Sequence, residues 1–262
     1  MRLFWELVKI SFQRHLTYRA ATLAGLVTNF VFGILRAAIF VALYDLQTEV
    51  EGITLQGVIT YAALGQALIG YLSIFSWFDL MNTVYTGDIA SDLLKPMNYF
   101  SYWMAQDLGR AGVQFLLRGV TLILGFGLIY DLYWPTPIAL SPIAVTLFLS
   151  WLISFSWRFL INLTAFWTPN ARGILRLIFV LSWFFSGFLM PLRFFPDWIQ
   201  SVGKWLPFSA MFNTVIEVYL GVVQGSELVW ALTQQVLWSI VLILAGQMVL
   251  RSGIRRLVIL GG

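Results

Sequence analysis

Residues 21–43 read ATLAGLVTNFVFGILRAAIFVAL, an apolar stretch whose one charged side chain belongs to Arg36. A helix needs about 20 such residues to cross the hydrocarbon core of a bilayer, so this stretch predicts a membrane-spanning helix. The rest of the chain has the same character, because 60% of its 262 residues are hydrophobic and only 11% are charged. Soluble domains are about 45–50% apolar and about 25% charged. The composition therefore excludes a soluble domain and predicts an integral membrane protein.

Six apolar runs divide the chain, and we predict an all-α protein with six transmembrane helices at about 21–43, 55–78, 111–130, 141–166, 174–190 and 228–250. Residues 1–20 instead mix basic and bulky apolar side chains, which is typical of a helix lying in the membrane interface. No apolar run directly follows a basic start, so we expect no cleaved signal peptide. Because no gap is long enough for an aqueous domain, residues 1–262 are predicted to form a single transmembrane domain.

The basic residues are distributed unevenly between the connections, and this asymmetry predicts the orientation. If the amino terminus is cytoplasmic, the cytoplasmic segments hold most of the 16 Lys and Arg residues, and the outer segments hold only Arg193 and Lys204. We therefore predict a multi-pass protein of the cell (inner) membrane, embedded in the lipid bilayer with both termini in the cytoplasm. The net charge of +4 does not indicate a nucleic-acid partner, because the basic residues lie in short clusters between apolar runs.

The connection between the second and third spans, residues 79–110, contains a short helix-forming segment at 86–96. Thr86 or Asp88 can cap its start and Pro96 ends it. Apolar side chains on one face predict an amphipathic helix exposed to the cytosol, and that face is formed by Ile89, Leu93 and Leu94. The residues of interest in this segment are Gly87, Asp88, Ile89, Asp92, Leu93, Leu94, Lys95 and Pro96.

The connection between the fifth and sixth spans is too apolar for a solvated loop and too rich in proline for one continuous helix. We predict a re-entrant or surface-lying helical hairpin on the outer side, at residues 186–207. The residues that define it are Ser186, Gly187, Pro191, Pro196, Trp198 and Pro207.

Polar stripes occur inside several apolar runs. In the first span Asn29, Gly33 and Arg36 share one helical face, and in the fourth span Ser154, Arg158 and Asn162 do the same. One interpretation is a translocation surface between two protomers, since charges at membrane depth usually face protein or water. The other is helix packing, in which these groups bond across the bundle or reach the headgroups. For Arg158 and Arg118 the acids Asp79 and Asp107 are possible partners, whereas no span offers a carboxylate near Arg36.

The chain lacks the residue clusters that catalysis or metal binding would need. It contains no cysteine and one histidine, His15, so thiolate and multi-histidine metal sites are excluded. No G-x-x-x-x-G-K-[ST] phosphate loop occurs anywhere in the sequence. We predict no catalytic residue, no metal site and no cofactor site in this chain, which is therefore not expected to be an enzyme. A membrane protein without a nucleotide-binding motif that uses ATP would have to receive its energy from elsewhere.

In order and spacing, these segments resemble the ABC-2-type permeases, in particular the bacterial permeases of about 260 residues whose ATPase is a separate chain. The resemblance covers the whole chain and depends on the Gly87 to Pro96 segment and on the Ser186 to Pro207 hairpin. It implies a complex of two permease halves, identical or homologous, with two ATP-binding cassette subunits that bind ATP and Mg. It also implies that residues 86–96 form the coupling helix that docks on the ATPase. Most members are exporters of varied cargo.

Two other classes of membrane protein fit the sequence less well. A secondary transporter would be expected to show repeated halves and an acidic residue near the midplane, but the acids avoid the spans. A membrane-embedded transferase would need a cluster of His, Asp or Cys near one interface, and His15 with scattered aspartates does not provide a convincing one. The sequence therefore favours an ABC transporter permease, with a secondary transporter as the alternative and a transferase as a weaker one.

Overall fold

The computed structural model describes residues 1–45, 47–168 and 171–256. The longer helices are α2 (Arg19–Tyr44), α3 (Leu55–Leu72), α6 (Tyr99–Gln114), α8 (Leu140–Asn162), α9 (Ala171–Ser186) and α13 (Gly225–Ile254). The shorter ones are α1 (Arg2–Leu16), α4 (Asp79–Thr86), α5 (Ile89–Leu93), α7 (Thr121–Gly127), α10 (Asp197–Lys204), α11 (Pro207–Met211) and α12 (Asn213–Tyr219). The π-helical turn η1 (Phe115–Val120) joins α6 to α7, and the 3₁₀ turns are η2 (Pro137–Ala139), η3 (Leu163–Phe166) and η4 (Leu192–Phe194).

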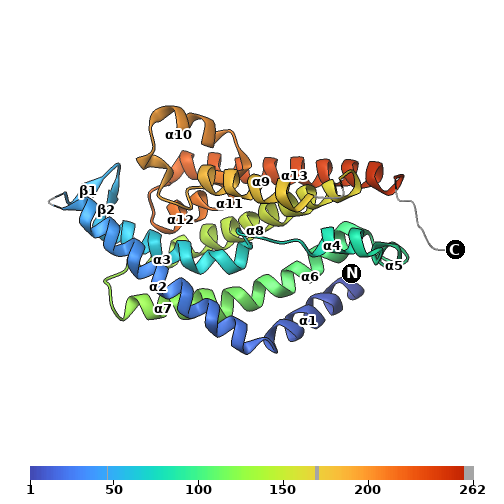
Figure 1. Ribbon diagram of the computed structural model, residues 1–262. Coiled ribbons are helices and arrows are strands. Elements are labelled where there is room, and N and C mark those ends of the chain that lie inside the picture. The colour runs from blue at the N-terminus through green and yellow to red at the C-terminus, as the bar shows by residue number, and fades with distance from the viewer. Residues whose placement is uncertain (46, 169–170, 257–262) are drawn as a thin grey trace.

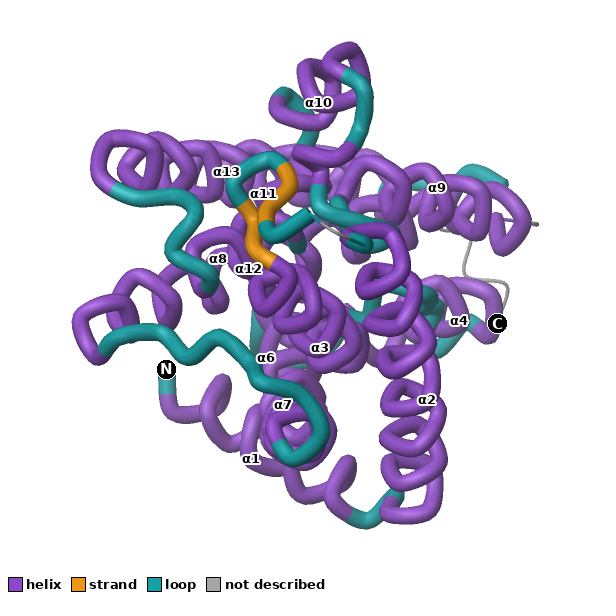
Figure 2. The backbone as a smooth tube through the Cα atoms, turned by 90° about the vertical axis from the view of Figure 1, so that its left-hand side faces the viewer, coloured by secondary structure: helices purple, strands orange, loops and turns teal. Residues whose placement is uncertain are grey.

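The longer helices run side by side along the long axis of the molecule (Figure 1). One end carries a two-stranded antiparallel hairpin, β1 (Glu49–Val50) and β2 (Ile53–Thr54), together with α10. The opposite end carries α4, α5, the start of α1 and the end of α13. We call these the β-hairpin end and the α4–α5 end. Seen along the bundle, α3 lies in the middle of the other helices (Figure 2).

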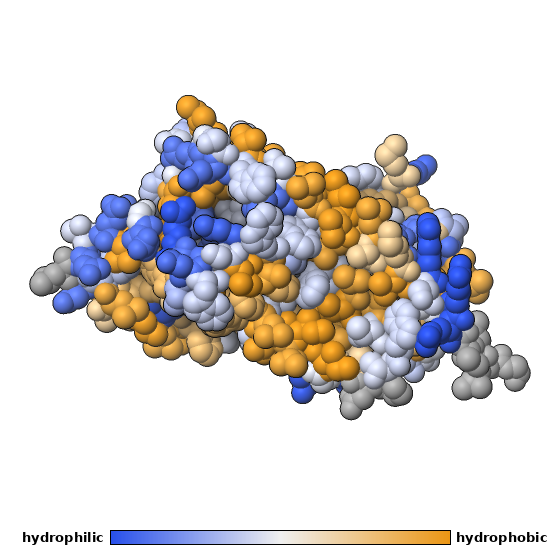
Figure 3. Space-filling model, turned by 90° about the horizontal axis from the view of Figure 1, so that it is seen from above, coloured by the Kyte–Doolittle hydropathy of each residue, from blue (hydrophilic) through white to orange (hydrophobic). Residues whose placement is uncertain are grey.

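The helices differ in how much of their surface other helices cover. Most of α3 is buried, whereas most of α2 and α13 is exposed. The exposed side chains of α2 are large and apolar, including Leu23, Phe32, Leu35 and Ile39. On the face seen in Figure 3, hydrophobic side chains occupy the middle of the molecule and hydrophilic ones gather toward the two ends. This distribution is the one expected where lipid surrounds the middle and water surrounds the ends.

Within the described residues, five helical segments are long and apolar enough to cross a membrane. They are Ala20–Tyr44, Leu55–Leu72, Tyr99–Gly127, Pro137–Phe166 and Gly225–Ile254. The helix in the position of the predicted fifth span, α9, has 16 residues, fewer than the roughly 20 that a perpendicular span requires. The chain is thus a mostly helical, multi-pass membrane protein, and a sixth crossing through α9 stays a prediction.

The helices around the second and third predicted spans differ from the predicted ranges of 55–78 and 111–130. The chain leaves α3 after Leu72, where Ser73 adopts a left-handed conformation with φ 50°, so residues 73–78 form a connection. The third spanning segment begins at Tyr99, well before residue 111. The sequence placed Asp107 and Arg110 in a cytosolic loop, whereas the structure pairs these charges inside the bundle. Pairing makes their burial in a helix tolerable.

The amino-terminal helix α1 packs along α6. The hydroxyl of Ser11 is fully buried and donates to the carbonyl oxygen of Gln106, 2.6 Å away. Nδ1 of His15 lies 2.8 Å from the carbonyl oxygen of Ser11, one helical turn earlier. Other side chains of α1 remain exposed, including Trp5 and Ile10. This arrangement agrees with the helix predicted at residues 1–20, and its position in the membrane interface stays a prediction.

Candidate functional site

The predicted coupling segment at 86–96 comprises the turn between α4 and α5, the five-residue helix α5 and the turn that follows it. Helix α4 ends at Thr86, Gly87 follows with φ 81°, and α5 begins at Ile89. The hydroxyl of Thr86 donates to Asp88 Oδ2 over 2.7 Å, and the Asp88 side chain caps no backbone N–H. The two predicted caps therefore bond to each other and hold the turn, instead of starting one helix.

The apolar side chains of this segment do not share one face, and the prediction for Ile89, Leu93 and Leu94 is wrong in this respect. Ile89 is 1% exposed and belongs to the main hydrophobic core, and Leu93 is partly buried against the same core. Leu94 lies beyond the end of α5 and is 86% exposed. The segment is therefore anchored through Ile89 and presents Leu94 outward, at the α4–α5 end of the molecule.

The turn after α5 is held by a charged pair. Lys95 Nζ lies 2.6 Å from Asp92 Oδ1 and 3.9 Å from the centre of the Tyr102 ring. Partial burial lowers the pKa of Lys95, but hydrogen bonds to Asp92 and Tyr102 outweigh it, so the pKa is raised. Lys95 is therefore charged at neutral pH and ties the turn before Pro96 to α6. The start of α6 is capped by Asn98, whose side chain accepts from the backbone N–H of Phe100 and Ser101.

The end of α3, directly before α4, is bound by side chains from three other helices. Carbonyl groups at a helix end lack partners within the helix and must find them elsewhere. The donors are Arg110 of α6 to the carbonyl oxygens of Gly70 (2.6 Å) and Tyr71 (3.1 Å), Ser154 of α8 to Leu72 (2.7 Å), Trp183 of α9 to Ile74 (2.5 Å) and Asn162 of α8 to Trp77 (2.8 Å). The connection between α3 and α4 is thus fixed to α6, α8 and α9.

A buried ion cluster lies beside this connection. Asp107 of α6 has no exposed side-chain surface and accepts two hydrogen bonds from Arg158 of α8, at 3.0 and 2.8 Å. It also accepts from Arg110 at 2.9 Å and from the indole of Trp151 at 2.9 Å. Four donors therefore compensate the desolvation of one carboxylate. The sequence named Asp107 only as one possible partner of Arg158, and Trp151 and Trp183 were missed, because a tryptophan in an apolar run carries no signal of its partner.

The polar stripe of α2 faces other helices of the same chain. The side-chain amide of Asn29 is buried and donates to the carbonyl oxygen of Gln66 of α3, 3.2 Å away. Gly33 packs against Phe126 of α7 and against Gln66. Helix packing thus accounts for Asn29 and Gly33.

Arg36 is half-buried and reaches the segment that follows α9. One guanidinium nitrogen donates to the carbonyl oxygen of Phe188 over 2.7 Å, and the guanidinium lies 4.6 Å from the centre of the Phe188 ring. Arg36 therefore connects α2 to the predicted hairpin through a backbone carbonyl and an aromatic face.

Arg118 occupies the π-helical turn η1. It donates to Gln114 Oε1 over 3.1 Å, and its guanidinium lies against the backbone of α2 at Gly25. A carboxylate partner for it is absent from the described ion pairs. Its Nε is buried without a hydrogen-bond partner in the part of the chain that the structure describes. Neither Asp79 nor Asp107 forms the ion pair with Arg118 that the sequence left open.

The residues of the predicted outer hairpin lie at the turns of a folded segment. Ser186 ends α9, Gly187 follows with φ 81°, and its carbonyl oxygen lies 2.7 Å from the Tyr61 hydroxyl. That hydroxyl also lies 2.9 Å from Asn213 Oδ1. Pro191 precedes η4, Pro196 precedes α10 and Pro207 begins α11, while Trp198 of α10 is 64% exposed. Each proline thus stands where a helix begins, a position that tolerates its missing N–H.

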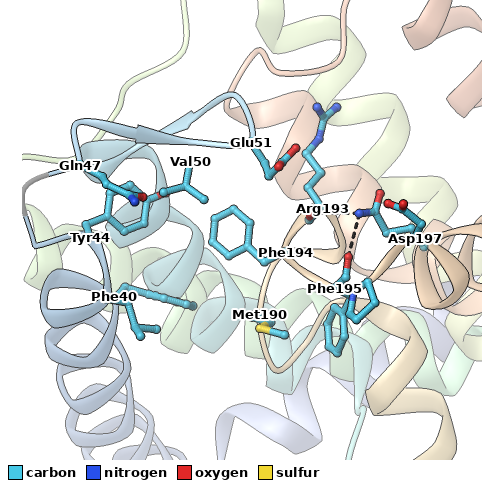
Figure 4. Close-up of a pocket in the computed structure, with 13 residues that line it drawn as sticks. Phe40, Tyr44, Gln47, Val50, Glu51, Met190, Arg193, Phe194, Phe195 and Asp197 are labelled. Atoms are coloured by element: carbon cyan, nitrogen blue, oxygen red, sulfur yellow. Dashed lines mark hydrogen bonds between the residues drawn. The ribbon is translucent and has the colours of Figure 1, made fainter.

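A cavity of about 590 Å³ lies between this segment and the part of α2 at the β-hairpin end. Figure 4 shows Phe40 and Tyr44 of α2 on one side and Met190 and Phe194 on the other. Arg193 also lines it and is paired with Glu217 of α12 at 2.8 Å. The charged lining groups, besides Arg193, are Glu51 and Asp197. Aromatic walls with a few charged groups suit an amphipathic ligand.

These features define a helical membrane protein in which short, packed helices that do not span the membrane lie at both ends of the spanning helices. A family model described as ABC-2 family transporter protein matches residues 30–261, which is most of the chain. The chain belongs to this family and is a permease of an ABC transporter. Family membership favours this class over the secondary transporter and the transferase. No curated protein matches the chain.

Proposed function

We propose that this permease is an exporter subunit that forms half of a translocation path and is driven by a separate cassette ATPase. The ATPase would supply ATP and Mg binding, and this chain would supply the path. The second half of the path would be another copy of this chain or a homologous permease. We place both ends of the described chain, the start of α1 and the end of α13, on the cytoplasmic side of the inner membrane. Residues 257–262 lie outside the described residues.

The observation that carries this proposal is the geometry of the α4–α5 end. Leu94 is exposed next to a turn that Asp92 and Lys95 hold in place, and Ile89 anchors α5 in the core. A surface side chain on a rigid base suits docking of a partner through a small apolar contact. A displacement of α5 would be transmitted through α4 to the end of α3. Because α6, α8 and α9 all bind that connection, the displacement would reach these helices as well.

For the path itself, we propose Arg36 and the cavity between α2 and the outer segment. Arg36 has no carboxylate partner among the described residues and bonds only to the Phe188 carbonyl. Because the Arg36 guanidinium makes one hydrogen bond and no ion pair, it can exchange that partner when cargo passes. Asn29 and Gly33 would then set the distance between α2 and α3.

The docking role is tested by Leu94→Asp in the full-length permease, co-expressed with its ATPase. The variant should insert at normal yield but lose most of the copurifying ATPase, because a charge replaces the exposed apolar contact. The matched control is Trp205→Asp, since Trp205 is 74% exposed in the turn between α10 and α11, outside the spanning segments. Normal ATPase retention by Leu94→Asp would reject residues 86–96 as the docking segment.

The orientation is tested with single cysteines in this cysteine-free chain. Cysteines replacing Glu49, Asp131 or Lys204 should react with an impermeant thiol reagent on intact cells, whereas those replacing Asp92 or Arg172 should not. Labelling at residue 92 from outside would reverse the proposed orientation. Direction is tested in vesicles by whether cargo accumulates on the side opposite the ATPase.

A further inference from the structure

A groove of about 510 Å³ lies on the surface between α13 and the end of α8, continuing along η3. It is at the α4–α5 end of the molecule, since η3 packs against α4. The lining residues are Leu160, Ile161, Thr164, Trp167, Met248, Val249 and Ser252. The transport proposal uses none of them.

The walls of this groove are fixed by close helix packing. The chain tightens from α-helix to 3₁₀-helix at Leu163, at the end of α8. Below that point Gly253 of α13 lies directly against the ring of Phe166. The two walls therefore meet at a rigid contact, and the groove is formed before any ligand arrives. Its volume lies within the range of about 300–1,000 Å³ that is usual for ligand sites.

The groove is apolar along its length and cationic at its end. Met248 of α13 lines the groove and is exposed, and Val241 and Leu244, earlier on the same helix, are exposed apolar side chains as well. Ser252 follows Met248 after four residues, so it shares its helical face, and Arg256 lies two residues beyond the end of α13. The guanidinium of Arg256 lies 5.9 Å from the centre of the Trp167 ring, at the mouth of the groove.

Two more arginines, Arg251 and Arg255, stand within the same turn and are exposed. None of Arg251, Arg255 and Arg256 forms an ion pair with a carboxylate within the described residues. Three unneutralised positive charges therefore border an apolar groove where the hydrophobic middle of the molecule meets its hydrophilic end. A purely apolar occupant would leave these charges unmatched.

We propose that this groove binds one anionic phospholipid, with an acyl chain along Met248 and Ile161 and the phosphate at Arg255 and Arg256. Guanidinium groups bind phosphate oxygens with two parallel hydrogen bonds, and the indole of Trp167 suits the headgroup level. The exposed apolar side chains of α13 beside the groove, Leu244 and Met248, would give an acyl chain access from the bilayer. The residues that line this site are not among those proposed for the cargo path or for docking of the ATPase.

The test is lipid retention by the purified full-length permease, measured by native mass spectrometry after mild delipidation with phosphatidylglycerol or phosphatidylcholine present. The wild type should retain one phosphatidylglycerol per chain in preference to phosphatidylcholine. Arg255→Gln/Arg256→Gln should reduce phosphatidylglycerol retention roughly 30-fold, at about 1 kcal/mol per basic residue. Ser252→Phe, which fills the groove, should reduce retention of both lipids.

The matched control is Arg2→Gln/Lys9→Gln, which removes two exposed basic residues from α1 and should leave retention unchanged. An equal loss in this control would mean diffuse attraction to the membrane surface and would overturn the proposal. Unchanged retention in Arg255→Gln/Arg256→Gln or in Ser252→Phe would do the same, as would displacement of the lipid by millimolar inorganic phosphate. Unfolding midpoints of all variants in neutral detergent establish that each is folded.

Discussion

The end of α3 and the end of α9 are both places where a membrane helix stops and the chain turns into short packed helices. At the end of α3, the freed carbonyls are bound from α6, α8 and α9, with a fully buried ion cluster of Asp107, Arg110 and Arg158 alongside. At the end of α9, the carbonyls of Gly187 and Phe188 are bound by Tyr61 of α3 and Arg36 of α2. The two ends solve the same hydrogen-bonding problem with different chemistry.

The difference suggests different mechanical roles. A buried carboxylate with four donors is costly to disturb, so the α3–α4 connection is expected to move as one body with α6 and α8. The segment after α9 depends on a half-buried arginine of α2, a helix with a largely exposed surface. We therefore expect a rigid α3–α4 connection that transmits force and a segment after α9 that adjusts.

The largest effect should come from Asp107→Asn. Loss of the charge leaves Arg158 buried without its ionic partner, and breaking a buried pair in this way costs about 3–5 kcal/mol. The free energy of unfolding of the purified full-length chain measures it. Asp88→Asn, at an exposed acid of the same end, is the control and should change little.

The pair Asp107→Leu/Arg158→Met sharpens this result. Replacing Asp107 and Arg158 with apolar side chains removes the two fully buried charges, and Arg110 keeps its bonds to the carbonyls of Gly70 and Tyr71, so much of the lost stability should return. A double variant as unstable as Asp107→Asn would mean that the hydrogen bonds to the α3 end, and not the ion cluster, hold the α3–α4 connection.

The next effect compares one substitution at the two turns, Gly187→Ala and Gly87→Ala. Both glycines have φ 81°, so alanine pays a backbone penalty of about 1–2 kcal/mol at either site. At Gly187 the added methyl would also lie 2.7 Å from Asn213 Oδ1 and 2.8 Å from the Tyr61 hydroxyl, whereas at Gly87 it meets nothing within 4 Å. Gly187→Ala should therefore cost about 1–3 kcal/mol more. Equal free energies of unfolding for the two variants would show that the turn at Gly187 rearranges around the added methyl group at no extra cost.

A smaller effect on stability, but a clear one on transport, is expected for Arg36→Leu. The Phe188 carbonyl loses its donor, which costs about 1–3 kcal/mol, while ATPase association should stay normal. Transport in proteoliposomes should change in rate or cargo preference. Arg36→Lys should transport like the wild type if only the positive charge matters. It should transport like Arg36→Leu if the contact of the guanidinium with the Phe188 ring matters. The control is Leu35→Ala on the exposed face of α2, and normal transport by Arg36→Leu would make Arg36 a purely structural residue.

The smallest effect concerns His15 and the packing of α1 on α6. Burial lowers the pKa of His15, and the nearby Arg14 and Arg110 act in the same direction. The folded state therefore prefers neutral His15, and its stabilising contribution is present above the unfolded pKa of about 6.5. It is lost as pH falls through the lower folded pKa. The protection of α1 amides against hydrogen exchange, relative to the intrinsic exchange rate at each pH, should thus fall as the pH is lowered from 7.5 to 5.5, and His15→Gln should abolish most of that change. The same pH response in both proteins would contradict a role for His15.

Local sequence signals located the helix breaks at residues 86–96 and 186–207, because Gly87, Pro96, Gly187 and Pro191 act on their own backbone. The same signals gave the wrong face for Leu94, since one residue past the end of α5 the helical periodicity no longer applies. They also left the polar stripe of α2 open between two interpretations. Its contacts are with Gln66, Phe126 and Phe188, and periodicity within α2 carries no information about distant residues.

By itself the sequence determined that this chain is a helical membrane protein, because an apolar run in lipid must satisfy its backbone hydrogen bonds internally. It also indicated the ABC-2 family through the order of its segments, and the family model agrees. Only the tertiary structure decided that the third spanning segment begins at Tyr99 and carries Asp107 and Arg110 into the bundle. The reason is that the Asp107 carboxylate is tolerated inside a helix bundle only where an opposite charge lies beside it. That charge belongs to Arg158, which is 51 residues away along the chain.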